Sequence, residues 1–159
     1  MKLSSQEEYG LRCLLQIARQ GDAGSLTIAE MSQREGITAP NVAKIMRILR
    51  RAGLVQSTRG KAGGYRLVRP PSQVPVGEAL AALGGRLFDA TFCDRHSGSE
   101  DHCLNTSDCS IRPVLRHVQD AVDQVLARLT LQSLLRPESE VAVSIGPRAV
   151  PLRVGSRTS

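Results

Sequence analysis

The stretch between residues 27 and 69 constrains the fold of this chain more than any other. It opens with a helix signal over TIAEMSQRE, in which Thr27 and Glu30 have the spacing of a capping box. The residues GIT then interrupt the helical pattern, and a second helix is predicted from about Ala39 to Ala52. Two helices joined by a short turn that contains glycine are typical of a helix-turn-helix.

The second of these predicted helices has two chemically distinct faces. Apolar residues recur on one face at helical spacing and are expected to be buried: Val42, Ile45, Met46 and Leu49. The remaining positions carry hydrogen-bond donors and positive charges: Asn41, Lys44, Arg47 and Arg51. A helix with one buried side and one donor-rich side is what a DNA recognition helix requires, so these four residues are predicted to contact DNA.

A basic, glycine-rich hairpin is predicted directly after this helix. Two short strands are expected at 54–57 and 65–68, and the turn between them carries Arg59, Gly60 and Lys61. Cations beside glycines suit close approach to phosphates or to a narrow minor groove, which is the role of a wing. The alternative is an ordinary glycine-rich hairpin tip with no role in binding.

The distribution of charge supports binding to a polyanion. The net charge is +6, and no acidic residue occurs between Glu35 and Glu78. That interval holds these basic residues: Lys44, Arg47, Arg50, Arg51, Arg59, Lys61, Arg66 and Arg69. A long basic stretch in a folded region is an electrostatic footprint for nucleic acid, although charge alone is also compatible with a solvated basic face.

Three of the four cysteines lie together in the polar segment between residues 91 and 113. Cys93, Cys103 and Cys109 have the spacing C-x9-C-x5-C, and three thiolates in such a segment can converge on a soft metal centre. Structural zinc sites usually show paired C-x2-4-C ligands, which are missing here. On spacing alone, redox-active thiols or cysteines without a special role remain alternatives. Cys13, in the first predicted helix, is expected to be a small buried residue.

A long helix is predicted from Ser110 to about Leu135. Valines and a leucine recur in it at spacings of three and four: Val114, Val118, Val122, Val125 and Leu129. This apolar stripe must be covered, and the same helix of a second copy would cover it, although packing against its own domain is an alternative.

The expected architecture is mainly α with a small β-hairpin: a winged helix-turn-helix plus a long C-terminal dimerisation helix. Residues 1–71 would form the DNA-binding domain, 72–109 a short helix and the cysteine loop, 110–136 the dimerisation helix and 137–159 a disordered tail. No apolar run approaches the roughly 20 residues that cross a bilayer, so no membrane partner and a cytoplasmic location are expected. A small thiol redox enzyme is the alternative from another class, but no C-x-x-C or phosphate-binding glycine motif supports an enzyme.

These segments together resemble the Rrf-type family of iron–sulfur-dependent bacterial transcription regulators, which includes IscR, NsrR and RirA. The resemblance covers residues 1 to about 135 and is most specific in the wing motif RGxxGGYxLxRPP at residues 59–71. It implies a homodimer that binds an inverted-repeat operator as a repressor. It also implies an iron–sulfur cluster, 2Fe–2S or 4Fe–4S, ligated by Cys93, Cys103 and Cys109 and sensing redox state, nitric oxide or iron status.

The sequence departs from the family pattern in two ways. Nine residues separate the first two cysteines, where the family usually has five. The position three residues after the last cysteine, a histidine in the IscR branch, is Arg112, which cannot ligate. In the NsrR branch an acidic residue near the N-terminus of the partner subunit is the fourth ligand, and Glu8 matches it. Glu8 could instead form a capping box with Ser5.

Two further possibilities concern the cysteine segment. His102 and Asp108 are local alternatives to Glu8 as the fourth ligand. A winged-helix regulator that senses by zinc or by thiol oxidation, without a cluster, is the alternative to an iron–sulfur protein.

Overall fold

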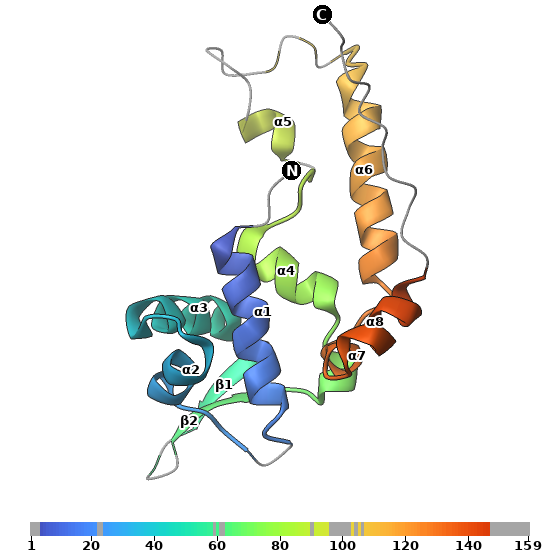
Figure 1. The fold of residues 1–159 in the computed structure, drawn as a ribbon. Helices are drawn as coiled ribbons and strands as arrows, with labels where there is room; N and C mark the ends of the chain where they lie inside the picture. The colour runs from blue at the N-terminus through green and yellow to red at the C-terminus, as the bar shows by residue number, and fades with distance from the viewer. Residues whose placement is uncertain are drawn as a thin grey trace, which may run out of the picture.

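The structure is a computed structural model of the 159-residue chain, and it describes residues 4–21, 24–58, 60, 63–89, 91–95, 103, 105 and 107–146. The elements in chain order are α1 (Ser5–Ala18), α2 (Ile28–Glu35), α3 (Ala39–Arg51), β1 (Val55–Thr58), β2 (Gly64–Leu67), a 3-10 turn (Pro71–Gln73), α4 (Val76–Gly84), α5 (Phe92–Arg95), α6 (Ile111–Leu126), α7 (Leu131–Leu134) and α8 (Glu138–Ile145) (Figure 1). The predicted fold class, mainly α with one small hairpin, is confirmed.

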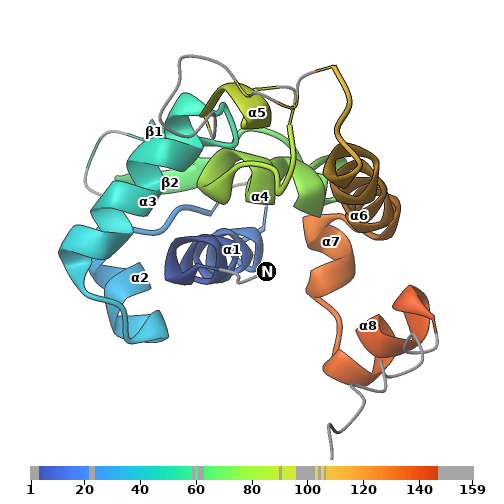
Figure 2. The ribbon, with the colours of Figure 1, turned by 90° about the horizontal axis from the view of Figure 1, so that it is seen from above.

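Helix α1 lies at the centre of the DNA-binding unit. It contacts α2, α3, α4 and α7, and the view from above shows these helices around it (Figure 2). The chain has no tryptophan and few other aromatic residues, and its core is built mainly from aliphatic side chains and methionines. Its largest fully buried members include Leu14, Ile17, Leu26, Met31, Met46, Leu49, Leu54 and Leu131.

The first helix is capped one residue earlier than expected. Ser4 is extended, and its hydroxyl accepts a hydrogen bond from the Glu7 amide at 3.3 Å, while the Glu7 carboxylate accepts from the Ser4 amide at 2.8 Å. Ser5 is already helical, so the capping box of Ser5 with Glu8 is wrong. The box predicted for Thr27 and Glu30 is confirmed.

The two strands form an antiparallel hairpin that is tied to the start of α2. Their register pairs Val55 with Leu67 and Thr58 with Gly64. Tyr65 also exchanges backbone hydrogen bonds with Leu26, of 2.8 and 3.0 Å. A Cβ atom at Gly64 would lie 2.6 Å from the Leu26 carbonyl, so this close approach requires glycine.

The long C-terminal helix is shorter than predicted. Helix α6 ends at Leu126 instead of continuing to about 135. The chain then returns to the DNA-binding unit: the Val76 amide donates to the Leu129 carbonyl, and the Leu131 amide donates to the Val74 carbonyl, both at 2.9 Å. Helix α7 follows and buries Leu131, so tertiary pairing ends the helix where local propensity would have continued it.

The tail expected to be disordered over 137–159 is helical in its first part. Helix α8 follows Pro137, and Glu138 and Glu140 lie in its first turn, where negative charge stabilises a helix. The disorder prediction is therefore wrong for 138–145, and residues 147–159 lie outside the described part of the chain.

Within the described residues, no helix has the length and hydropathy needed to cross a membrane. One end of α6 lies near α4, and the helix projects away from the DNA-binding unit, with α5 above α4 in this view (Figure 1). The fold thus separates the basic half of the chain from the cysteine-bearing half.

Candidate DNA-binding surface and cysteine segment

Helix α3 has the two faces that its sequence predicts. Val42, Met46 and Leu49 are completely buried and Ile45 is almost so. The four predicted DNA-binding residues of the helix are all exposed: Asn41, Lys44, Arg47 and Arg51. Their arrangement places donors and positive charges on one accessible surface, while their contacts with DNA remain a prediction.

The turn before α3 is fixed by hydrogen bonds that hold the two helices in place. Gly36 adopts the left-handed conformation, with φ of 65°, that ends α2. The Ser32 hydroxyl donates to the Ile37 carbonyl at 2.6 Å. These bonds set the direction in which α3 leaves the turn.

Helix α1 also holds the end of α2, through a cluster that the sequence analysis missed. The Arg12 guanidinium donates to the Glu35 carboxylate at 2.7 Å and to the Glu35 backbone carbonyl at 2.6 Å. Gln16 donates to the other Glu35 carboxylate oxygen. Gln16 and Arg12 lie on α1, 19 and 23 residues before Glu35 of α2, so no short-range sequence pattern predicts these contacts.

The wing tip is described only in part. Gly60 is exposed, with φ of 110°, and its carbonyl accepts from the Gly63 amide at 2.8 Å. Arg59 and Lys61, the predicted wing contacts, lie outside the described residues. Among the other basic residues of this region, Arg69 is paired with Glu78 at 2.6 Å, so its charge is partly neutralised.

The three clustered cysteines are half-buried and free of disulfide bonds. Cys93 lies in the short helix α5, whereas Cys103 and Cys109 lie in the connection that leads to α6. Thiols of this kind suit a soft metal centre or redox chemistry. However, the described residues contain no group of three or more His, Cys, Asp or Glu side chains gathered as a metal site. The donor types fit an iron–sulfur cluster, and the described thiols are not preassembled around one point.

Cys13 contrasts with the other three thiols. It is fully buried in α1, and burial raises its pKa to about 11. A thiol that is buried and protonated at neutral pH is a poor nucleophile and a poor metal ligand, which agrees with the structural role predicted for it.

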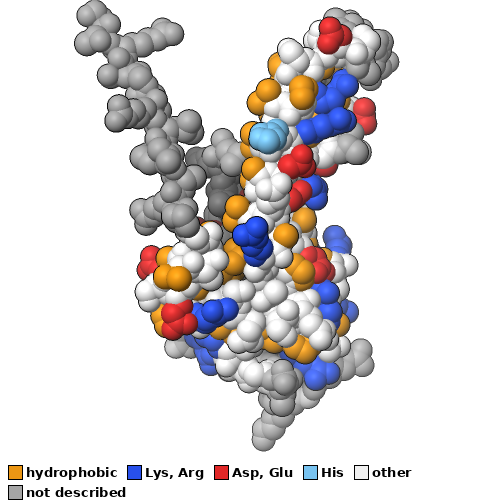
Figure 3. All heavy atoms as spheres, turned by 90° about the vertical axis from the view of Figure 1, so that its right-hand side faces the viewer, with side chains coloured by type: hydrophobic (Ala, Val, Ile, Leu, Met, Phe, Trp, Pro, Cys, Tyr) orange, Lys and Arg blue, Asp and Glu red, His pale blue; other side chains and the backbone are white. Residues whose placement is uncertain are grey.

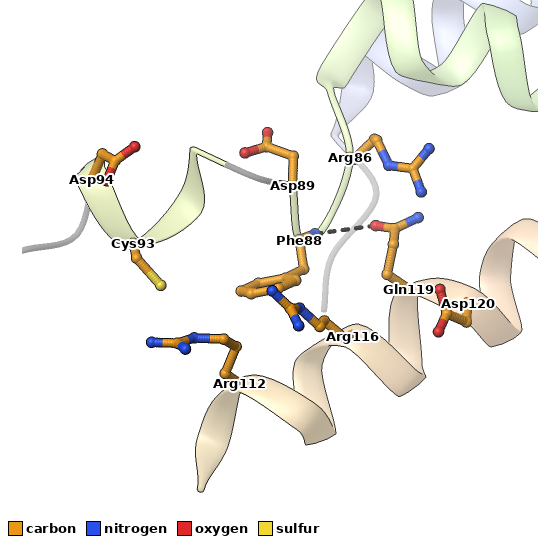
Figure 4. Close-up of a pocket in the computed structure, with 9 residues that line it drawn as sticks. All are labelled: Arg86, Phe88, Asp89, Cys93, Asp94, Arg112, Arg116, Gln119 and Asp120. Atoms are coloured by element: carbon orange, nitrogen blue, oxygen red, sulfur yellow. Dashed lines mark hydrogen bonds between the residues drawn. The ribbon is translucent and has the colours of Figure 1, made fainter. Parts of the chain in front are cut away.

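Cys93 lines a cleft of about 640 Å³ between residues 86–94 and helix α6. Figure 4 shows Cys93 and Asp94 on the α5 side, and Arg112 and Arg116 on the α6 side. The full lining is Arg86, Phe88, Asp89, Cys93, Asp94, Arg112, Arg116, Gln119 and Asp120. Arg112, which stands where the IscR branch has a histidine, thus belongs to the same cleft as a predicted cluster ligand.

Gln119 forms the floor of this cleft and joins its two walls. Its buried amide oxygen accepts from the Phe88 amide at 3.0 Å, and its nitrogen donates to Asp123 at 2.8 Å. Asp123 is also ion-paired with Arg86, and Phe88 packs against Phe92 with ring centroids 5.1 Å apart. The cysteine segment is therefore anchored to α6 at one end, close to Cys93.

The candidates for a fourth ligand differ in their surroundings. The side chain of Glu8 is 62% exposed and lies 3.4 Å from Arg12. Glu7, not Glu8, completes the cap of α1. Asp108 is exposed near Cys109, while His102 lies outside the described residues. Glu8 is thus not required by the cap, and its role as a ligand remains a prediction.

The family model for Rrf2, described as an iron-dependent transcriptional regulator, matches residues 3–137 of this chain. The chain belongs to the Rrf2 family. It is similar to the protein rrf2 of Nitratidesulfovibrio vulgaris, with 33% identity over 152 residues that cover 94% of this chain and 99% of the relative. It is also similar to the transcriptional regulator IscR of Escherichia coli O1:K1, with 31% identity covering 91% of this chain and 86% of IscR.

Solved structures of Rrf2-type regulators share this fold. The structure of T. potens IscR aligns with a TM-score of 0.68 and 27% identity, covering 85% of this chain and 86% of the other. CymR of B. subtilis, described as a global cysteine regulator, aligns with a TM-score of 0.66 and 27% identity, covering 85% and 96%. The family members are transcriptional regulators and not enzymes, so this chain is a DNA-binding transcriptional regulator.

Proposed function

We propose that the chain is a homodimeric cytoplasmic repressor that senses redox state, nitric oxide or iron status through an iron–sulfur cluster. The observation that carries the proposal is the set of three half-buried thiols, none of them in a disulfide, in the segment that leads directly into α6. Soft thiolates are the ligands that iron–sulfur clusters use. The similarity to IscR adds support for a cluster in this position.

The DNA-binding half would act through α3 and the wing. The exposed face of α3, with Asn41, Lys44, Arg47 and Arg51, enters the major groove, where asparagine and arginine read base edges and lysine contacts phosphate. Arg59, Gly60 and Lys61 reach the neighbouring minor groove or the backbone. A twofold dimer presents two such helices about 34 Å apart, one turn of DNA, so the operator is an inverted repeat.

Cys93, Cys103 and Cys109 would hold the cluster, with the partner's Glu8 as the fourth ligand and His102 or Asp108 as local alternatives. When bound, the cluster supplies a centre that oxidants, nitric oxide or loss of iron can alter. Cys109 lies two residues before α6, and Cys93 faces α6 across the cleft, so both ends of the ligand set adjoin this helix. Binding or loss of ligation at the thiols therefore changes how firmly the segment is held against α6.

Helix α6 would be the main dimer contact. It leaves several large apolar side chains exposed, and apolar side chains are visible along the length of the helix in Figure 3. A row of exposed apolar side chains along one face of a helix suits packing against another helix. The two cysteine segments of a dimer would then lie on either side of the same helix pair.

The test is an absorbance spectrum with iron and sulfide counts on protein purified without oxygen. The wild type is expected to be coloured and to contain iron and sulfide in stoichiometric amounts. The triple variant Cys93→Ala/Cys103→Ala/Cys109→Ala should be colourless, while the matched control Cys13→Ala keeps its colour. A wild type that stays colourless after reconstitution with iron and sulfide would exclude the cluster.

A regulator that senses through zinc or thiol oxidation, without a cluster, is the second candidate. The described residues contain no gathered metal site, and the fold is shared with the cysteine regulator CymR. This candidate predicts a colourless wild type whose affinity for DNA changes on treatment with zinc or peroxide. The triple cysteine variant would lose that response and keep its basal DNA affinity.

A further inference from the structure

The exposed apolar stripe of α6 has a symmetry that suits one particular pairing. Ile111, Val114, Val118 and Val125 are exposed, and Val122 is half-buried beside them. Around Val118, these residues lie seven and four positions before and four and seven positions after it. Each of these offsets is close to a whole number of helical turns, so all five residues share one face.

A stripe that is symmetric about its centre is self-complementary when two copies pack antiparallel. A twofold axis at Val118 would then place Ile111 opposite the partner copy's residue 125, and Val114 opposite residue 122. The charged residues Arg112, Arg116 and Asp120 lie on the opposite side of α6, where they line the cleft beside Cys93, so they do not interrupt the stripe. The apolar pattern of α6 therefore favours a second copy in antiparallel orientation.

The stripe alone is too small for a stable dimer. The fifteen residues from Ile111 to Val125 span about 21 Å, and a stripe about 10 Å wide gives a footprint of roughly 200 Å². A typical stable interface covers about 800 Å² on each partner. A second surface must therefore continue the contact beyond the stripe.

A groove at one end of the stripe provides such a surface. It has a volume of about 340 Å³ and lies between the end of α6 and helix α8, lined by Ala121, Gln124, Val125, Arg128, Leu129, Ser144 and Ile145. Val125, which is 51% exposed, belongs to both the stripe and the groove. On the α8 side, Ile145 is 50% exposed. Helix α8 follows directly after the residues that match the family model.

We propose that this groove receives the first turn of α6 of a second copy, with Ile111 as the inserted side chain. The inference rests on the proposed homodimer. Antiparallel packing brings Ile111, the first residue of α6 and 64% exposed, opposite Val125 at the groove. Since Cys109 is two residues away, α8 of one copy would lie against the cysteine segment of the other and would help to form the sensing site.

The test compares two substitutions on α8 by sedimentation equilibrium of the full-length protein. Ile145→Asp replaces the apolar contact in the groove by a charged side chain and should raise the dimer dissociation constant about tenfold or more. Val143→Asp is the matched control, because Val143 is 82% exposed and does not line the groove. It should change the constant less than about twofold. Equal effects of the two substitutions would overturn the proposal.

A second set of variants distinguishes loss of this contact from a defect in folding. Ile111→Asp should also weaken the dimer, and Ile111→Asp combined with Ile145→Lys should recover part of the loss, because the two residues face each other across the interface. Additive losses in the double variant would contradict that contact. A wild type that stays monomeric at all concentrations would instead refute the homodimer itself, which separates the two failures.

A photo-crosslinker placed at position 145 identifies the neighbour directly. In a mixture of ¹⁴N- and ¹⁵N-labelled chains, mass spectrometry should find links between light and heavy chains in peptides around Ile111. Links within one chain only, or links to the partner's residues near 125, would overturn the antiparallel contact.

Discussion

The DNA-binding unit and the cysteine segment are held in place in very different ways. The helices of the DNA-binding unit have capped ends and defined turns, and they share one buried core. From residue 85 to the end of α6, only Phe88 and Gln119 are buried among the described residues, and the element that carries Cys93 has four residues. One half of the molecule is therefore held by a buried core, and the other has few buried contacts and would gain from additional ties such as a ligand or a partner.

The largest expected difference between the two halves concerns stability. Leu49→Ala removes a completely buried side chain from α3 and should cost about 2–5 kcal/mol of unfolding free energy. Val118→Ala shortens an exposed side chain on α6 and should cost below about 0.5 kcal/mol in the monomer. Urea denaturation at a concentration that favours monomers measures both. Similar losses would mean that α6 belongs to the same cooperative core.

The reactivity of the thiols should also differ between the DNA-binding unit and the cysteine segment. In cluster-free protein at pH 8, Cys13 should react with a thiol reagent at least about a hundredfold more slowly than the three clustered cysteines, because exposure requires opening of the core. Its pKa of about 11 also keeps the thiolate scarce at this pH, and its reactivity should rise as the pH approaches that value. Four equally fast thiols in the folded protein would contradict the contrast.

DNA affinity should depend on the basic half alone. Arg47→Ala should weaken binding to the operator about tenfold and reduce the dependence of affinity on salt by roughly one ion. Arg116→Ala removes the same charge from α6, in the cleft beside Cys93, and should leave DNA affinity of the cluster-free protein unchanged. Fluorescence anisotropy over a range of salt concentrations measures both slopes, and an equal effect of the two variants would assign α6 to the DNA surface.

The smallest effects distinguish two glutamates bound by the same arginine. Glu35 is nearly buried and accepts bonds from Arg12 and Gln16, so Glu35→Gln should cost about 1 kcal/mol. Glu8→Gln should have almost no effect on the cluster-free protein, because exposed ion pairs contribute little. If Glu8→Gln nevertheless shortens the lifetime of the reconstituted cluster, the result would support Glu8 as a ligand of the cluster. An unchanged lifetime would favour one of the local ligands.

The sequence predicted those features that short-range patterns encode. The box of Thr27 and Glu30, the stop at Gly36 and the two faces of α3 depend on residues within a few positions of one another. The run SSQEE offers two capping boxes of equal spacing, and only the structure distinguishes Ser4 from Ser5.

Features that depend on distant residues could not be predicted in this way. The end of α6 is set by pairing of residues near 130 with residues near 75, and Glu35 is held by side chains on another helix. Helix α8 lacks a clear apolar period, so its sequence looks like that of a disordered tail. For the candidate site, the residue types were evident from the sequence, and their surroundings were not: the shared cleft of Cys93 and Arg112 required the fold.

The bridge between Pro75 and Thr130 turns everything between these residues into a closed loop with both ends fixed on the DNA-binding unit. Chain entropy in such a loop changes only with the logarithm of its length, so four more residues in a loop of about 55 residues cost less than about 0.1 kcal/mol. Residues can therefore be gained or lost inside the loop while the recognition helix keeps its position. Because both ends of the loop are held on the DNA-binding unit, the length of the sensing segment is independent of the position of the recognition helix.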